Sequence, residues 1–209
     1  MDRRCEVLVL GIGNLLWADE GFGVRAVEAL HAAYSFPTGV TLQDGGTLGL
    51  LLYEAVASSR RVLVFDAIDF AEPPGTLRVL RGGDVPAWGR TRMSPHQTGF
   101  NDVLALAQLN DRAPAEIVAI GVQPVELDDF GGSLRAPVRQ RLAEAAHIAA
   151  EQIAAWGFPG TPRVFGLPFE PLNAKPLALQ AYESGRPSAA DSCRIGDPRL
   201  LATRVRNGS

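Results

Sequence analysis

Lysine is almost missing from this chain of 209 residues, in which Lys175 is the single example. Chemistry that depends on lysine is therefore excluded from residues 1–174, and with it the P-loop, which binds phosphates through a Gly-Lys-Ser/Thr sequence. The 20 basic side chains are outnumbered by 23 acidic ones, and the formal net charge is −3. Because the chain lacks a cationic excess, we expect it to have no nucleic-acid partner.

Cysteine is also scarce, since only Cys5 and Cys193 occur, at opposite ends of the chain. This spacing does not favour a structural disulfide and is typical of a protein in a reducing compartment. No stretch approaches the roughly 18 uninterrupted apolar residues that a membrane span needs. The apolar run 7–13 after Arg3 and Arg4 is too short for a secretion signal and lacks a cleavage site. We therefore expect a cytoplasmic protein with no membrane insertion.

Short apolar runs alternate with amphipathic segments up to about residue 157, which is typical of a layered α/β fold. Strands are predicted at 7–10, 40–43, 61–65, 76–80 and 116–122. Helices are predicted around 24–34 and at 48–57, 99–109 and 134–156. The connection 72–75 is too short for a parallel crossover, so the strands before and after it are antiparallel if they pair. The sequence thus predicts a three-layer α/β/α fold with a mixed, twisted five-stranded sheet that contains one antiparallel strand.

The composition changes near residue 157, which divides a predicted α/β domain, 1–157, from a Pro/Arg-rich C-terminal extension, 158–209. From residue 157 onward the chain holds seven of its 15 prolines and carries a formal charge of +3, against −6 for residues 1–156. The extension either wraps loosely around the core or is left mobile. An alternative is a docking arm for an acidic partner surface.

Several familiar active-site motifs fail. The turn after the first strand contains Gly11 and Gly13, but Leu16 stands where a dinucleotide-binding fingerprint has its third glycine. No serine occurs in a G-x-S-x-G nucleophile elbow. Cys5 begins a strand and not a helix, so an activated thiolate is not favoured.

Acidic residues follow two of the predicted strands. Asp19 and Glu20 come shortly after the first strand, and Asp66 ends the third. Ligand sites in open α/β sheets gather outside the carboxyl ends of the strands, so Glu20 and Asp66 are expected to face one crevice. A carboxylate that closes an apolar strand is costly unless it is paired, hydrogen-bonded or bound to a cation.

His96 is the third candidate. It lies in the segment Ser94-Pro95-His96-Gln97-Thr98-Gly99, where Ser94 or Thr98 can cap a helix and Pro95 suits its first position. Two carboxylates and an imidazole form a three-ligand site for a borderline divalent metal such as Zn²⁺ or Ni²⁺. The alternative is structural: Glu20 caps a helix, Asp66 accepts loop amides and His96 is a surface residue.

The sequence resembles the hydrogenase maturation endopeptidases, which trim the C-terminal extension of the nickel-iron hydrogenase large subunit. The resemblance covers roughly residues 6–157 in several ordered blocks. These blocks are Leu8 to Leu16, Asp19 to Val24, Asp44-Gly45-Gly46-Thr47, Val64-Phe65-Asp66-Ala67 and Ser94 to Gly99. It implies a mixed five-stranded sheet with flanking helices, related to the phosphorylase/hydrolase-like scaffold, and metal contacts from Glu20, Asp66 and His96.

The resemblance further implies that nickel arrives on the substrate, already held by its cysteine thiolates. The enzyme then supplies only the remaining ligands, and cadmium or zinc can replace nickel there. Hydrolysis follows either from a water activated at the metal or from a carboxylate acting as general base. The family is often grouped with aspartic-type peptidases, which casts Asp66 or Glu20 as the base, and Glu20, Asp66 and His96 as the catalytic residues.

The leading hypothesis is therefore an endopeptidase that acts as a monomer on the precursor of the hydrogenase large subunit after nickel insertion. A second hypothesis is a nickel-sensing maturation chaperone that binds the precursor without cutting it. A third is a hydrolase of the related scaffold that acts on nucleosides or peptidyl-tRNA, although the acidic core and the missing lysines argue against it.

Overall fold

The computed structural model describes residues 5–82, 95–164, 166 and 168–186, apart from the side chains of 95–98. Within these residues, five strands form the central sheet in the order β3-β1-β4-β6-β5. The strands are β1 (Cys5–Ile12), β3 (Val40–Gly46), β4 (Ser59–Ala67), β5 (Leu77–Arg81) and β6 (Glu116–Val122). Parallel pairing joins β3, β1, β4 and β6, and β5 pairs antiparallel with β6. The predicted mixed sheet is thus confirmed, with its antiparallel strand on the edge beside β6 and not beside β4.

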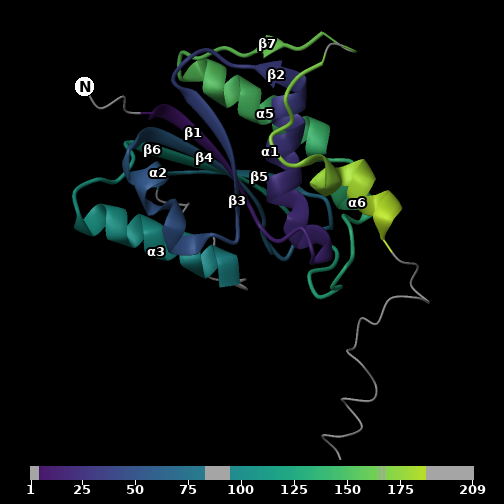
Figure 1. The fold of residues 1–209 in the computed structure, drawn as a ribbon. Helices are drawn as coiled ribbons and strands as arrows, with labels where there is room; N and C mark the ends of the chain where they lie inside the picture. The colour runs from purple at the N-terminus through teal and green to yellow at the C-terminus, as the bar shows by residue number, and fades with distance from the viewer. Residues whose placement is uncertain (1–4, 83–94, 165, 167, 187–209) are drawn as a thin grey trace, which may run out of the picture.

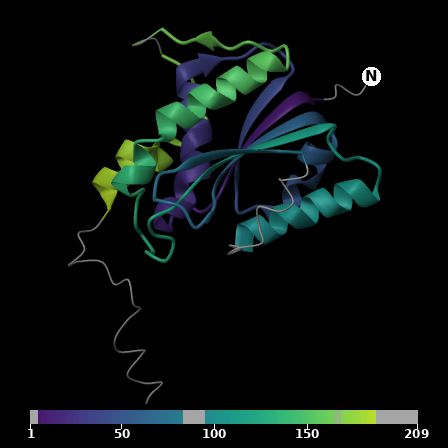
Figure 2. The same ribbon diagram turned by 180° about the vertical axis from the view of Figure 1, so that it is seen from behind.

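Helices cover both faces of the sheet, as Figures 1 and 2 show from opposite sides. One layer contains α1 (Phe22–Ala33), α4 (Ala136–Arg139) and α5 (Leu142–Ala155). The other contains the 3-10 helix η2 (Gly49–Leu52), α2 (Tyr53–Ala57) and α3 (Pro95–Leu109). No described helix is long and apolar enough to cross a membrane.

The two layers enclose two separate apolar cores, because successive side chains of a strand point to opposite faces. On β1, Val7 and Val9 pack in the core beneath α1 and α5, whereas Leu8 and Leu10 pack in the core beneath α2 and α3. All four are at most 2% exposed. The continuous apolar runs of the central strands follow from this burial on both faces.

The predicted helix 134–156 is wrong in one respect, because it is broken into α4 and α5. The Arg141 N–H donates to the carbonyl of Val138, three residues back, at 3.0 Å. Such a bond tightens the last turn and ends α4. In the same way the predicted helix 48–57 divides into η2 and α2, and α3 begins at Pro95, four residues before the predicted start of 99–109.

The C-terminal extension contributes elements that the sequence pattern did not predict. Its two-residue strand β7 (Thr161–Pro162) pairs antiparallel with β2 (Tyr34–Ser35), a two-residue strand directly after α1. Further on, the 3-10 helix η5 (Lys175–Leu177) and helix α6 (Leu179–Gly185) lie alongside α1. We call residues 168–186 the C-terminal strap. Its packing fits the interpretation of an extension that wraps around the core, and the domain boundary at residue 157 stays a prediction.

Candidate active site at the carboxyl edge of the sheet

Glycines allow the first helix to approach the ends of two strands. A side chain on Gly23 would place its Cβ 2.1 Å from the Ile12 carbonyl oxygen and 2.3 Å from that of Phe65. Both distances are far below any real Cβ contact, and both neighbours are backbone atoms. The start of α1 therefore rests directly on the carboxyl ends of β1 and β4. Gly11, the next-to-last residue of β1, packs from the other side: a Cβ there would lie 2.3 Å from the Gly23 carbonyl oxygen.

Glu20 lies on the short 3-10 helix η1 (Ala18–Gly21), just before α1. It is partly exposed and lines a hollow of about 350 Å³. Asn14, Trp17, Thr47, Gly49, Leu127 and Asp128 line the rest of this hollow. The walls thus come from the β1–α1 connection, from the segment after β3 and from the segment after β6. The position agrees with the prediction of a crevice at the carboxyl edge of the sheet.

Asp66 is the next-to-last residue of β4 and is fully buried. Its Oδ1 accepts a hydrogen bond of 2.8 Å from the Ala67 N–H. Strand alternation turns Asp66 to the same face as Val62 and Val64, toward α2 and α3. Cα atoms of η1 and β4 come within 8 Å of each other. The structure therefore brings the elements that carry Glu20 and Asp66 together; Glu20 lines the hollow, whereas the buried Asp66 is not among its lining residues.

His96 lies in the first turn of α3, and its side chain is outside the described residues. The contacts of Gly99, which follows three residues later on α3, show where this turn lies. A Cβ on Gly99 would lie 3.1 Å from the Cα of Gly49, which lines the hollow. The helix start that carries His96 is thus next to the hollow.

No group of three or more His, Cys, Asp or Glu side chains that could hold a metal ion occurs among the side chains that the structure describes. The trio of Glu20, Asp66 and His96 includes a side chain outside that set. Its convergence therefore stays a prediction, supported so far by the placement of the three elements.

Asp19 has a role that the sequence did not reveal. The pair Asp19 and Glu20 looks equivalent in sequence, but Asp19 is fully buried. Its carboxylate accepts backbone N–H groups from Val125 at 2.8 Å, Glu126 at 3.0 Å and Arg135 at 2.7 Å. Asp19 therefore anchors the segment after β6 to the loop that carries Glu20. Nothing in the local sequence shows which of two adjacent acids turns inward.

Several exposed large apolar side chains lie next to lining residues of the hollow in the sequence. We define the apolar rim as the exposed apolar residues that either lie within two positions of a lining residue in the sequence or pack on one: Leu16, Leu48, Leu50, Leu51 and Phe130. Phe130 packs edge-on against Trp17, with ring centroids 5.3 Å apart. Clustered exposed apolar groups of this kind mark surfaces that bind a ligand or another protein. Phe22, also close to Glu20 in sequence, is fully buried in the core and is not part of this rim.

A larger hollow, of about 580 Å³, lies near the start of β6 and the side of α3, away from the residues discussed so far. Its carboxylate, Glu116, accepts hydrogen bonds of 3.0 Å from Arg61 Nε and from Trp156 Nε1. These bonds, chiefly the one from Arg61, lower the pKa of Glu116. The group is therefore committed to a structural ion pair, and the smaller hollow is the better candidate for chemistry.

Comparison with known proteins decides the family. The family model described as hydrogenase maturation protease matches residues 24–152. The chain belongs to the hydrogenase maturation protease family. This family of endopeptidases acts in hydrogenase maturation, so the predicted family and the predicted fold class are both confirmed.

Two groups of relatives differ in how much of the chain they match. The hydrogenase expression/formation protein HoxM of Azotobacter vinelandii is 52% identical over 94% of this chain and 94% of its own. HupD of Rhodobacter capsulatus is 49% identical over 96% of each chain. The solved structure of the hydrogenase maturating endopeptidase HybD from E. coli matches with a TM-score of 0.72 and 35% identity. That match covers 98% of the E. coli chain but only 76% of this one.

Proposed function

We propose that this maturation protease removes the C-terminal extension of the nickel-iron hydrogenase large subunit after nickel has been inserted. The observation that carries the proposal is the placement of Glu20 on a hollow at the carboxyl edge of the sheet, next to the strand end that carries Asp66. The family membership and the names of the relatives support the choice of substrate. We further propose that the enzyme acts as a monomer.

Nickel belongs to the substrate in this proposal, where cysteine thiolates hold it. Glu20, Asp66 and His96 then offer two carboxylates and one imidazole to the remaining positions. Carboxylates are harder ligands than thiolates, so this set binds nickel too weakly to strip it from the precursor. It does add affinity when the precursor presents the metal. Nickel insertion is thereby checked before the peptide bond is cut.

Cleavage requires a base that activates water. Glu20 lines the hollow and is partly exposed, whereas Asp66 is fully buried. We therefore assign the general base to Glu20 and the fixed second carboxylate to Asp66, as the two acidic groups of a proposed aspartic-type peptidase. The water adds its oxygen to the scissile carbonyl carbon, and its proton passes through Glu20 to the leaving amine as the C–N bond breaks.

The test is incubation of the purified protein, alone, with the purified precursor in nickel-loaded and nickel-free forms. Intact mass spectrometry is expected to show loss of the C-terminal peptide from the nickel-loaded form only. A stable complex without loss of mass would overturn the proposal in favour of a nickel-sensing chaperone. Equal cleavage of both forms would overturn the nickel check.

The apolar rim is expected to bind the C-terminal part of the precursor. Leu51, two residues after the lining residue Gly49, is 81% exposed, and Leu109, at the far end of α3, is 82% exposed. Leu51→Glu should raise KM for the nickel-loaded precursor about tenfold. Leu109→Glu is the matched control and should leave KM unchanged. The free energy of unfolding of both variants should stay within about 0.5 kcal/mol of the wild-type value, because each changes an exposed side chain. Equal KM values for the two variants would contradict this role of the rim.

A further inference from the structure

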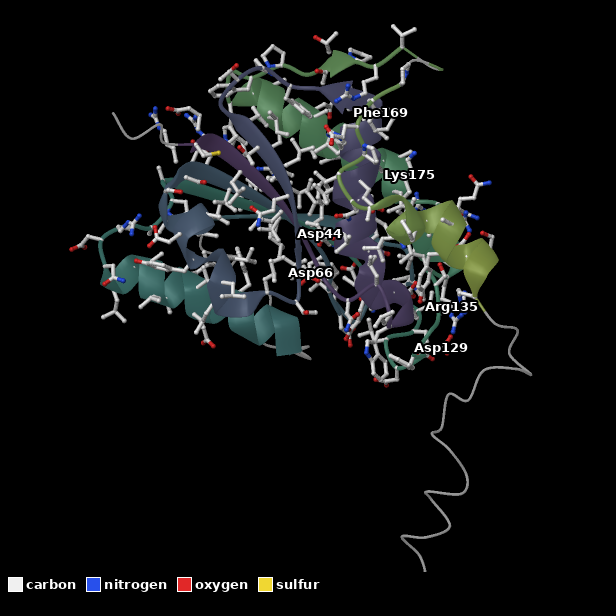
Figure 3. All side chains as sticks on the ribbon, in the orientation of Figure 1. Asp44, Asp66, Asp129, Arg135, Phe169 and Lys175 are labelled. Atoms are coloured by element: carbon white, nitrogen blue, oxygen red, sulfur yellow. The ribbon has the colours of Figure 1, made fainter. Side chains whose placement is uncertain are left out.

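The C-terminal strap lies alongside α1, as Figures 1 and 3 show. Its hydrogen bonds with Arg25 and Glu28 place it on the polar face of this helix. Arg25, on this face, is only 3% exposed. Its guanidinium donates to Glu28 Oε2 at 2.8 Å and to the Leu177 carbonyl, and it stacks over the ring of Tyr182. The strap therefore covers a charged surface of the core with matched polar contacts.

Asn173 is the strap residue that reaches the end of β3. Its side-chain Nδ2 donates to Asp44 Oδ2 and to Glu28 Oε1, both at 2.9 Å. A primary amide has two N–H donors, and here one donates to a carboxylate on α1 and the other to a carboxylate on β3. Burial raises the pKa of Asp44, and the hydrogen bond from Asn173 opposes that rise. Asn173 thus stabilises the ionised form of a half-buried acid.

Asp44 is connected directly to one wall of the hollow. A backbone hydrogen bond joins its carboxylate to Gly46, whose carbonyl accepts from the Gly13 N–H at 3.0 Å. Thr47 and Gly49, which follow at once, line the hollow opposite Glu20. The position of Asp44 therefore sets where this wall begins.

The other end of the strap is fixed to the segment that forms the second wall. Glu183 accepts from Arg139 Nη1 and from Ser133 Oγ at 2.8 Å, and the Tyr182 hydroxyl donates to the Gly132 carbonyl at 3.1 Å. These partners closely follow Leu127 and Asp128, which line the hollow. One short piece of chain therefore ties together the two walls.

The comparisons suggest that the strap is an addition to the family fold. The E. coli endopeptidase HybD is matched over nearly its whole length by 76% of this chain. The unmatched 24% is about 50 residues, close in size to the 52 residues of the predicted extension 158–209. The relatives from A. vinelandii and R. capsulatus, in contrast, match more than nine-tenths of this chain. A shared addition that contacts both walls of the site is suited to adjusting recognition of a particular class of precursor.

We propose that Asn173 is a positioning residue: by holding Asp44, it sets the wall 47–49 in the place that fits the precursor. The inference rests on the proposed function and adds a determinant of substrate affinity to it. Asn173 is not one of the described residues that line the hollow. In this proposal it therefore acts through Asp44 and not by touching the precursor.

The decisive variant is Asn173→Asp, which keeps the shape of the side chain but points a third carboxylate at Asp44 and Glu28. We expect KM for the nickel-loaded precursor to rise about tenfold while kcat changes less than twofold. Hydrogen exchange of the backbone at 44–49 should become faster. Asn173→Ala removes the two N–H donors but adds no negative charge. It should show the same effects more weakly, and it separates the loss of the hydrogen bonds from the added repulsion.

Two further variants separate positioning from general destabilisation. Phe169→Ala removes a strap contact with His31 and Arg163, four residues before Asn173, without touching the hydrogen bonds of Asn173, and should leave KM and the exchange at 44–49 unchanged. Asn173→Asp combined with Asp44→Asn exchanges amide and carboxylate and restores the hydrogen bond between these two positions, although the new carboxylate still faces Glu28. The pair should therefore recover part of the lost affinity. A simple loss of stability would not be recovered in this way.

Each outcome has a distinct meaning. Unchanged KM and unchanged exchange at 44–49 in both Asn173 variants would overturn the inference, as would a parallel fall of kcat and melting temperature without a change in KM. If the wild type fails to cut the nickel-loaded precursor, the proposed function is overturned instead. The exchange of residues 44–49 in Asn173→Asp and Phe169→Ala then still decides whether the strap positions the wall.

Discussion

Asp66→Asn and Glu20→Gln are each expected to lower kcat for cleavage of the nickel-loaded precursor by roughly 10²-fold or more. Both replacements keep the size of the side chain and remove its charge. Glu20→Gln removes the proposed base, and Asp66→Asn removes the negative charge of the proposed second carboxylate ligand at the end of β4. The rate is measured by mass spectrometry of the precursor over time, and circular dichroism checks that the fold persists.

Asp111→Asn is the matched control for these two variants. Asp111 is an exposed acid just after α3, and its φ of 54° is a backbone conformation that asparagine tolerates well. Asp111→Asn removes one negative charge, as each of the two site variants does, but at a position far from the hollow. Near-normal cleavage by either site variant, or an equal loss in Asp111→Asn, would contradict the assigned roles.

Asp19→Ala is expected to lower the free energy of unfolding by roughly 2–4 kcal/mol. The change leaves the backbone N–H groups of Val125, Glu126 and Arg135 without their acceptor. For a chain of this length the melting temperature should fall by about 5–15 °C. Because the same bonds hold the second wall beside Glu20, cleavage should fall as well. Urea unfolding measures the loss of stability.

Asp102→Asn gives the comparison for Asp19. Asp102 is exposed on α3, so its replacement should change stability by no more than about 0.5 kcal/mol. Asp19→Asn keeps one acceptor oxygen and should fall between Asp19→Ala and the wild type. A wild-type melting temperature for Asp19→Ala would mean that the anchoring described above contributes little.

The sheet could be predicted because its determinants are local. Apolar runs such as 61–65 report burial on both faces, and the short connection 72–75 excludes a parallel crossover. The order of the strands was less accessible. That β5 pairs with β6 depends on contacts between residues about 40 positions apart, such as Leu80 with Ala119.

That Glu20 and Asp66 lie at one edge of the sheet was predictable for the same reason. Glu20 follows β1 and Asp66 is near the end of β4; these strands are neighbours, and neighbouring parallel strands end at one edge of the sheet. The different fates of Asp19 and Glu20 were not predictable, because the turn of η1 decides which side chain faces inward. The partnership of Asn173 and Asp44, 129 residues apart, leaves no trace in either local sequence.

The polar face of α1 gives a further example of this limit. Arg25 and Glu28 alternate with apolar residues in the pattern of a helix with one solvated face. The strap covers that face, and Arg25 becomes almost fully buried. Helical periodicity identifies the face that meets the sheet, but it does not show whether another segment covers the opposite face.

The central claim is that Glu20, Asp66 and His96 meet around one metal ion at the edge of the sheet. Soaking crystals of the protein with cadmium, as a substitute for the nickel of the substrate, and recording anomalous diffraction tests it most directly. The account predicts an anomalous peak within coordination distance of all three side chains. Three side chains too far apart to reach a common ion, with cadmium bound elsewhere, would contradict it.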